Sequence, residues 1–327
     1  MKRKQLLGFS AFMLTAAMFT ACTAEADTAA EEPDKEVEVQ EMDSISIGLM
    51  QIGGAVPVEY GIAEGIFEKH GLEVDYAFTR GGSVMVPAVQ TGEYDFAITN
   101  PLTIMQANDA GLDMRILTGF AYAYPEGEDT NAVVTRKDTG IEDFGDLAGR
   151  DVAINTLETQ GDLSIMEATE RGGGEAADIR FSEIAFPEME PQLDLGNVDA
   201  IWLPEPLLSK ALANPDNSIV GYSTQESVPG MPMLSTFTSA KYATENPEIV
   251  EKFIAAMDEV LTEAAANEPD VREFLPEFMG VPVEAIEHMK LEEWSSETRE
   301  DLVNDIGELA VKFDFIEAIP ENLYLDE

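Results

Sequence analysis

Polar residues that could bind a ligand occur where predicted strands end and predicted helices begin. Ser83 follows the pair Gly81-Gly82 at the start of one predicted helix, and Asn100 precedes Pro101 at the start of another. Backbone N–H groups at a helix N-terminus carry partial positive charge and can bind an anion or a carbonyl oxygen. Ser and Asn are also common helix caps, so each side chain could instead have a purely structural role. The sequence leaves both roles open.

Glu205 and Trp202 offer a second kind of chemistry near another predicted helix start. Glu205 precedes Pro206, although Glu is not a preferred residue at a helix N-cap. Its carboxylate is attracted to the helix dipole, and it could instead accept hydrogen bonds from a ligand amine or ring N–H. Trp202 ends a predicted strand and could either stack on a flat ligand or lie in the core. Both residues are therefore ligand-binding candidates.

The remaining candidates lie in loops or near strand ends. Arg80 could pair with an anionic ligand or be a solvated turn residue. Tyr122 belongs to an aromatic set beyond a predicted strand and could line a pocket or simply pack. Gln51 and Thr156 stand in polar loops that follow strands. The complete predicted ligand-binding set is Gln51, Arg80, Ser83, Asn100, Tyr122, Thr156, Trp202 and Glu205.

The elements that must position these residues alternate between short strands and helices. Residues 45–101 read as strand, helix, strand, helix and strand with glycine loops between them, and the pattern returns over residues 151–212. This alternation is typical of a parallel sheet with helical crossovers, so the predicted fold class is α/β. Ligands of such sheets bind beyond the carboxyl ends of the strands. Apolar residues of 248–266 have the spacing of one buried helix face.

A repeat links the two halves of this pattern. The run Gly92–Pro101 resembles the run Gly196–Pro206, because each has a glycine, an aspartate, a short apolar strand and a proline that opens a helix. Asn100 and Glu205 hold equivalent places in the two runs. We therefore predict two similar lobes, and ligand pockets often lie between such units.

The composition excludes one large class of function. The chain has 327 residues, enough for about two domains, and carries 64 Asp and Glu against 19 Lys and Arg, a formal net charge of −45. Affinity for phosphates depends on Lys and Arg, so nucleic-acid binding is disfavoured. An acidic surface fits either an ordinary well-solvated protein or one adapted to high salt.

Signatures of catalysis are sparse. The sequence has no Gly-x-Ser-x-Gly elbow, no P-loop and no Gly-x-Gly-x-x-Gly motif. His70 stands at a predicted helix end, and His288 has too few neighbouring ligands for a metal site. Cys22 is the only cysteine and precedes the predicted folded part. We predict a binding protein without catalytic residues, metal or cofactor.

The N-terminus predicts export and anchoring. Residues 2–4 are basic and residues 6–21 are apolar and uncharged, which is typical of a signal peptide and short for a membrane span. The run ends at Cys22 and resembles a lipoprotein box, with Phe19 where Leu is usual; the alternative is a stray cysteine. Residues 1–22 would then end in a lipidated cysteine on the outer face of the cell membrane. Residues 23–43 read as a disordered acidic tether.

Several segments, taken in order, resemble a known family. They match landmarks of substrate-binding proteins in the nitrate/sulfonate/taurine and thiamine-precursor group, the SsuA/THI5-like (NMT1-type) family. The matching segments are residues 60–74, 81–83, 92–95, 140–153, 198–200 and 205–206, and the resemblance covers roughly residues 45–322. It implies a type II periplasmic-binding-protein fold, in which two Rossmann-like lobes joined by a hinge close on a ligand cleft. Lobe 1 would comprise residues 44–131 plus 233–327, and lobe 2 residues 132–232.

The same resemblance implies partners and a ligand class. An ABC permease and its ATPase would receive the ligand, and we expect a monomer. The cleft-facing loops would be residues 51–55, 80–83, 99–100, 155–160 and 202–205. A sulfonate would want Arg, Ser and helix N-termini, whereas a pyrimidine or flavin-like ligand would want Trp, Tyr, Asn and a carboxylate. Because the implied lining is neutral to acidic apart from Arg80, it favours a neutral or cationic, heteroaromatic ligand over nitrate.

Two other functions stay open at this point. One is an enzyme on the same fold, similar to the yeast pyrimidine-synthesis relatives, which would need a histidine in the cleft. The other is a ligand-sensing lipoprotein that takes no part in transport.

Overall fold

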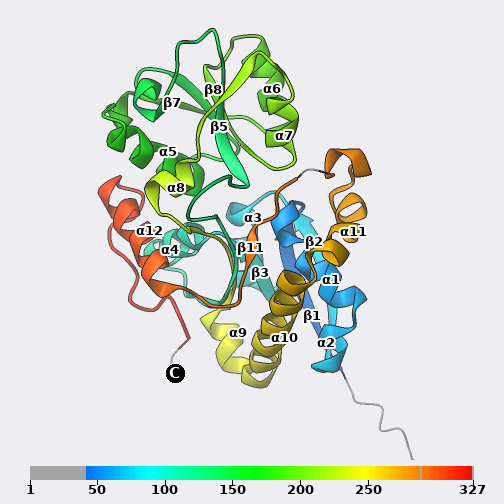
Figure 1. Cartoon of the computed structure of the whole chain (residues 1–327). Coiled ribbons are helices and arrows are strands. Elements are labelled where there is room, and N and C mark those ends of the chain that lie inside the picture. The colour runs from blue at the N-terminus through cyan, green and yellow to red at the C-terminus, as the bar shows by residue number, and fades with distance from the viewer. Residues whose placement is uncertain (1–41, 288, 326–327) are drawn as a thin grey trace, which may run out of the picture. The chain divides into compact units, whose positions relative to one another are not determined.

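The computed structural model describes residues 42–287 and 289–325 (Figure 1). The predicted signal peptide, Cys22 and all but the last two residues of the predicted tether lie outside the described residues. The chain from Gln40 onward forms one compact unit. Strand β1 begins at Asp43, which the sequence analysis assigned to the tether, so the folded part starts one residue earlier than predicted.

The first of two sheets has the strand order β11-β4-β10-β3-β1-β2. Strands β1, β2 and β3 run parallel, while β10 is antiparallel to both β3 and β4, and β11 is antiparallel to β4. The strand bounds are β1 (Asp43–Met50), β2 (Leu72–Thr79), β3 (Phe96–Thr99), β4 (Met114–Tyr122), β10 (Pro232–Ser239) and β11 (Glu293–Trp294).

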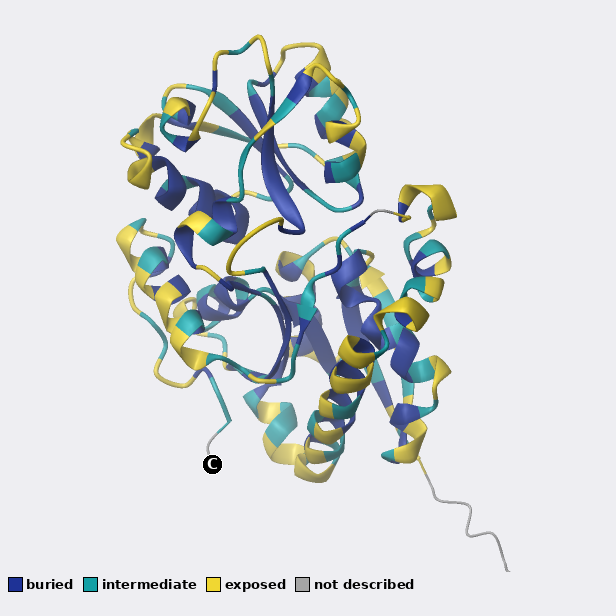
Figure 2. Ribbon diagram, viewed as in Figure 1, coloured by how far each residue is buried: buried dark blue, intermediate teal, exposed yellow. Residues whose placement is uncertain are grey.

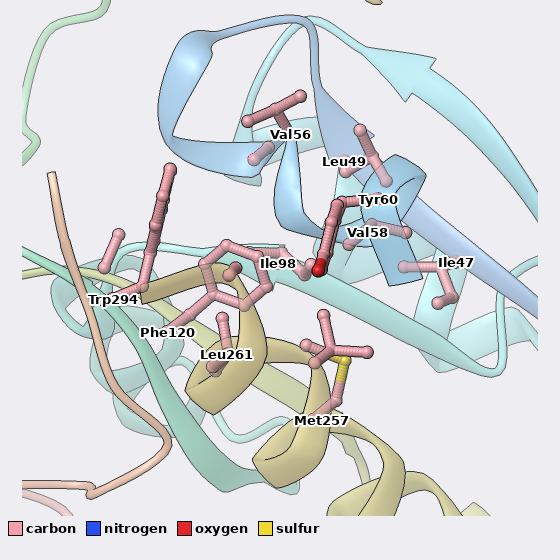
Figure 3. Close-up of a cluster of buried hydrophobic side chains, with 14 of the residues drawn as sticks. Ile47, Leu49, Val56, Val58, Tyr60, Ile98, Phe120, Met257, Leu261 and Trp294 are labelled. Atoms are coloured by element: carbon pink, nitrogen blue, oxygen red, sulfur yellow. The ribbon is translucent and has the colours of Figure 1, made fainter. Parts of the chain in front are cut away.

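Alternate residues of this sheet face two groups of helices. Along β1, Ile45, Ile47 and Leu49 lie at every second position and join one hydrophobic cluster, as the period of a strand requires. That cluster includes α1 (Pro57–Ala63), α2 (Ile66–Lys69), α10 (Pro247–Ala266) and α11 (Glu268–Met279). Figure 3 shows its centre, where Met257 and Leu261 of α10 approach strand residues such as Ile98.

The opposite face of the first sheet has a cluster of its own. It packs against α3 (Gly82–Thr91), α4 (Pro101–Asp109) and α12 (Glu300–Lys312). Three short helices belong to the same part of the chain: η1 (Gly53–Ala55), α9 (Ala240–Glu245) and η4 (Val283–Ala285). Buried residues follow the strands and the inner helix faces in Figure 2. We call the first sheet with these helices the first lobe.

The second sheet has the order β7-β6-β8-β5-β9. Residues of β8 alternate between two clusters: Ala200 and Trp202 pack on the side of α5, and Ile201 and Leu203 pack on the side of α6 and α7 (Figure 1). The strands are β5 (Asn131–Arg136), β6 (Asp151–Ile154), β7 (Arg180–Glu183), β8 (Ala200–Pro204) and β9 (Asn217–Gly221). The helices are α5 (Gln160–Arg171), α6 (Phe186–Asp194), α7 (Leu207–Leu212), α8 (Ser223–Ser227), η2 (Phe144–Leu147) and η3 (Ala176–Asp178). We call these elements the second lobe.

The chain passes between the sheets twice, once between β4 and β5 and once between β9 and β10. The two sheets have equivalent topologies. Strands β1, β2, β3 and β4 correspond to β6, β7, β8 and β9, and the antiparallel strand between the last two is β10 in the first sheet and β5 in the second. The predicted lobe boundaries, 131/132 and 232/233, each fall one residue after the start of a strand, because β5 begins at Asn131 and β10 begins at Pro232. A division of the chain into lobes just before these two strands is our proposal.

The sequence repeat makes the same contact in both lobes. Just before β3, Asp95 accepts a hydrogen bond on Oδ2 from the backbone N–H of Ser46, at 2.8 Å. Just before β8, Asp199 accepts one on Oδ2 from the backbone N–H of Asp151, at 2.9 Å. Each aspartate therefore ties the beginning of one central strand to its parallel neighbour.

Replacing Asp95 by alanine is expected to lower the free energy of unfolding by about 1–2 kcal/mol, because two partly buried donors would lose their acceptor. The backbone N–H and the hydroxyl of Ser46 both lose this acceptor, at 2.8 and 2.9 Å. Urea unfolding measures the change. Asp75→Ala, an exposed position on β2, is the matched control and should change stability by less than about 0.5 kcal/mol. Equal effects of the two variants would contradict a structural role for the repeat.

Candidate ligand-binding cavity

A cavity of about 560 Å³ opens between loops of the two lobes. That volume is in the usual range for a site that encloses a small organic molecule. From the first lobe the lining takes the start of α3, the start of α4 and Ile52; from the second it takes the loop after β6, the start of α5 and the end of β8. The lining residues used below are Ser83, Thr99, Asn100, Gln106, Thr156, Glu158, Gln160, Gly161, Phe186, Trp202 and Glu292.

Three helices, α3, α4 and α5, begin at this cavity. Asn100 caps α4, since its side chain accepts the Thr103 N–H at 3.0 Å. Ser83 does not cap α3: the N-cap is Gly81, no side chain bonds there, and Ser83 is an exposed residue of the cavity lining. The sequence left open whether each side chain caps a helix or binds a ligand. The structure shows that Asn100 is a helix cap and that Ser83 is not.

The loop before α5 is fixed by a capping box. Asp162 accepts hydrogen bonds from the backbone N–H groups of Glu158 and Thr159, at 2.6 and 2.7 Å. The backbone carbonyl of Glu158 in turn accepts a bond from the Gln106 amide of α4, at 2.9 Å. These contacts join α4 of the first lobe to the cavity loop of the second, and they hold Thr156 within the lining.

Trp202 belongs both to the core and to the cavity wall. Its side chain is 8% exposed, and it packs in the cluster between the second sheet and α5. A Cβ atom at Gly161 would lie 3.3 Å from the indole ring, so the glycine allows the ring to lie directly against the backbone of α5. Phe186 stands beside it, with 6.1 Å between ring centroids. These two rings form the aromatic part of the lining.

The structure brings four of the eight predicted binding residues together in the lining: Ser83, Asn100, Thr156 and Trp202. The other four lie outside it. Gln51 donates its amide to the carbonyl of Phe278 at 2.9 Å, and Arg80 is exposed in the turn before α3. Tyr122 is fully buried, and its hydroxyl donates to the carbonyl of Glu297. The sequence analysis placed it beyond the end of a strand, whereas β4 extends to Tyr122 itself.

Glu205 precedes Pro206, the N-cap of α7, and binds the first turn of that helix. Its carboxylate accepts the backbone N–H of Ser209 at 3.1 Å and the Ser209 hydroxyl at 2.7 Å. Burial raises the pKa of Glu205 above its ordinary value, and the two bonds to Ser209 oppose the rise. Glu205 is not among the residues of the cavity wall.

One carboxylate of the lining was missed by sequence reasoning. Glu292 lies just before β11, and its carboxylate rests against the backbone of Gly54, where a Cβ atom would be 3.0 Å from the Glu292 Cδ. Burial raises the pKa of Glu292 to about 7, and the nearby carboxylates of Asp129 and Glu205 add to the rise. No motif marks Glu292, since it reaches the cavity only because the chain returns to the edge of the first sheet.

The charges that line the cavity are both negative. They belong to Glu158, which is exposed, and to Glu292; the lining contains no Lys, Arg or His among the residues that the structure describes. His70 lies elsewhere and bonds Glu259 at 2.8 Å. Over residues 42–287 and 289–325, no group of three or more Asp, Glu, His or Cys side chains is placed to hold a metal ion. Within the same ranges, no helix has the length and apolar character needed to cross a bilayer.

The fold and the cavity between its lobes define the class of two-lobed solute-binding proteins, the type II periplasmic-binding-protein fold. A model of the NMT1/THI5-like family matches residues 55–271, which is more than half of the chain. The protein therefore belongs to the NMT1/THI5-like family.

Individual relatives agree with this assignment. A Bacillus subtilis protein described as an aliphatic sulfonates-binding protein is 24% identical over 72% of this chain and 71% of its own length. The riboflavin-binding protein RibY of Chloroflexus aurantiacus is 23% identical over 80% of this chain and 76% of its own. The periplasmic aliphatic sulphonate binding protein SsuA of Escherichia coli has the same fold, with a TM-score of 0.70, 17% identity and coverage of 86% and 96%. Relatives of this chain are thus binding proteins of periplasmic type.

Proposed function

We propose that this protein is an extracytoplasmic solute-binding lipoprotein that captures one small organic molecule between its lobes and delivers it to an ABC permease. The observation that carries the proposal is the cavity itself, which takes its wall from both lobes and has the starts of three helices around it. Lipidation of Cys22 would keep the chain at the outer face of the cell membrane, where a permease could receive the ligand.

Contacts between the lobes support capture by closure. The Gln106 amide reaches the Glu158 carbonyl at 2.9 Å, and the Gln160 amide reaches the Pro232 carbonyl at 2.7 Å. Lys312 of α12 pairs with Glu170 of α5 at 2.8 Å. Polar contacts of this kind can break and re-form when a ligand enters or leaves.

The lining favours a flat, neutral or cationic molecule. Trp202 and Phe186 offer ring faces, and both charges of the lining are negative. Binding without conversion is part of the proposal, because the relatives reported above are described as binding proteins.

An aliphatic sulfonate is the second candidate ligand. The starts of α3, α4 and α5 supply backbone N–H groups and positive dipole ends, and Ser83 adds a hydroxyl. Sulfonate-binding relatives agree with this choice. Among the described residues of the lining there is no Lys, Arg or His, however, so an anion there would bind beside the carboxylates of Glu158 and Glu292.

A ligand screen tests the proposal. A chain that begins at Gln40, which keeps β1 whole, is mixed with sulfonates, taurine, nitrate, pyrimidines, riboflavin and aromatic acids, and its melting temperature is recorded. We expect at least one compound to raise the melting temperature by several degrees at saturating concentration. The same compound should change the emission of Trp202, read as the difference between the wild type and Trp202→Phe. A panel without any binder would refute the proposal for these classes.

A further inference from the structure

One face of helix α5 lies against the first lobe. The residues of this face are spaced three or four positions apart: Gln160, Leu163, Glu167 and Glu170. Nearest the cavity, the Gln160 amide donates to the carbonyl of Pro232 at 2.7 Å. One turn further, Leu163 is fully buried in the hydrophobic cluster that the first sheet forms with α3, α4 and α12. The outer half of the face is charged, and it contacts the first lobe through ion pairs.

Lys312 is the residue of the first lobe that meets this charged half. It ends α12, which lies next to α5 (Figure 1), and its ammonium pairs with Glu170 at 2.8 Å and also with Glu167. Burial disfavours the charged form of Glu167, but its hydrogen bonds to Lys312 and Arg171 prevail and lower its pKa. Arg171 also donates to the carbonyl of Glu226, where the chain passes between the sheets for the second time. The network therefore joins both lobes and one of the connecting segments.

The two pairs of Lys312 are the only ion pairs found between the lobes in the part of the chain that the structure describes. Thirteen ion pairs occur there, and the other eleven join residues of the same lobe. The side chain of Glu167 is only 8% exposed, while those of Lys312 and Glu170 are 43% and 39% exposed. Water and salt therefore screen this link less than they screen a fully exposed pair.

Both lobes are strongly acidic and repel each other. Residues 131–231 contain 19 Asp and Glu against 6 Lys and Arg, and residues 42–130 with 232–327 contain 37 against 9. Repulsion between exposed charges acts over about 30 Å at 0.01 M salt but only about 8 Å at 0.15 M. The attraction that Lys312 supplies between the lobes therefore matters most where the salt concentration is low.

We propose that Lys312 is an ionic latch, which holds α12 against α5 and makes the separation of the two lobes depend on salt concentration. Breaking the latch removes an attraction between the lobes and leaves Glu167 and Glu170, two like charges on neighbouring turns, without their shared cation. The latch acts at a distance from the cavity, because none of these three residues lines it. This inference rests on the proposed function, in which the lobes open and close around the ligand.

Distances between two spin labels on the full chain test the latch. The labels are attached at Val283→Cys in the first lobe and Leu195→Cys in the second, two positions that are 62% and 73% exposed, with Cys22→Ser so that no other thiol reacts. Electron paramagnetic resonance then gives the fraction of molecules with the longer distance. At about 20 mM salt, Lys312→Gln should raise this fraction at least about threefold over the labelled parent, the scale of a partly exposed ion pair.

Salt concentration and a conservative variant test the electrostatic part of the inference. At about 500 mM salt, Lys312→Gln and the labelled parent should differ by less than about 1.5-fold, because screening weakens both the latch and the repulsion between the lobes. Lys312→Arg keeps the positive charge and should match the parent at both concentrations. An effect of Lys312→Gln that is equal at low and high salt would contradict an ionic latch.

Two further variants separate the latch from a simple effect of net charge. Glu170→Gln makes the chain less negative but breaks one of the two pairs, so it should open the lobes in the same direction by a smaller amount. Lys252→Gln removes the same charge as Lys312→Gln, but from a pair with Asp43 within the first lobe, at 2.6 Å, and should leave the distances unchanged.

The inference is overturned if Lys312→Gln leaves the distances unchanged, if Lys252→Gln opens the lobes equally, or if Glu170→Gln closes them. The ligand screen judges the proposed function separately, because it measures binding and not the motion of the lobes.

Discussion

Replacing Trp202 by leucine is expected to weaken ligand binding by about 10- to 100-fold. Stacking of a flat ring on an aromatic side chain contributes about 1–3 kcal/mol, and 1.4 kcal/mol corresponds to a factor of ten. Trp202 carries the largest ring of the lining, and Gly161 allows that ring to lie flat against the start of α5. Titration calorimetry with the compound that gives the largest thermal shift measures the loss.

Phe144→Leu is the matched control for this experiment. Phe144 packs in the same hydrophobic cluster as Trp202 but does not line the cavity. Both substitutions remove an aromatic ring from one core and should lower stability by roughly 1–3 kcal/mol. Affinity should fall only in Trp202→Leu. If both variants bind equally well, or lose affinity to the same extent, Trp202 is a core residue and the cavity is not the binding site.

Replacing Glu292 by glutamine is expected to raise the melting temperature of the ligand-free protein at pH 8. The folded protein raises the pKa of Glu292 from 4.5 to about 7. A carboxylate with a raised pKa destabilises the fold only where it is ionised: the effect is absent below pH 4.5, grows between pH 4.5 and 7, and is complete above pH 7. Glutamine removes it, so the gain should be on the order of 1–3 kcal/mol at pH 8 and vanish near pH 4.5.

Thermal unfolding at pH 5 and pH 8 measures this gain. Glu158→Gln should melt like the wild type at both values, because its carboxylate is exposed. A buried carboxylate that weakens the ligand-free fold is typical of a functional site, where activity and stability conflict. A lower melting temperature for Glu292→Gln at pH 8 would instead show that the carboxylate stabilises the fold.

Much of the fold followed from local pattern. The βα alternation predicted the parallel strands β1, β2 and β3, and the apolar spacing of residues 248–266 predicted α10 almost to its ends. The Gly-x-x-Asp repeat predicted two similar units, and the bonds of Asp95 and Asp199 give the physical reason. The antiparallel strand β10 was not predicted, because its place between β3 and β4 depends on pairing across more than a hundred residues.

The candidate site likewise contains residues that local sequence pattern predicted and residues that it did not. Ser83, Asn100 and Thr156 were found because each follows a strand whose carboxyl end faces the cavity, and Trp202 because it lies near the end of such a strand, β8. Thr99 and Gln160 lay in predicted cleft loops, although nothing in the sequence shows that their polar atoms would be buried and unpaired. Glu292 could not be found, since it lies just before the two-residue strand β11, which has no periodicity to detect.

The Asn100/Glu205 comparison shows how far a repeat can be used. Both residues precede the first turn of a helix, and both turn out to accept bonds from that turn, at Thr103 and Ser209. The repeat therefore predicts a shared bond to the first turn of the following helix. The two carboxylates of the cavity lining belong instead to Glu158 and Glu292, outside the repeat.

Native mass spectrometry of the protein with its best-binding compound tests the central claim most directly. We predict one ligand molecule per chain, lost in Trp202→Leu, and recovery of that ligand with its mass unchanged after the protein is denatured. Recovery of a chemically altered molecule would contradict binding without conversion. A stoichiometry that Trp202→Leu leaves intact would contradict the location of the site.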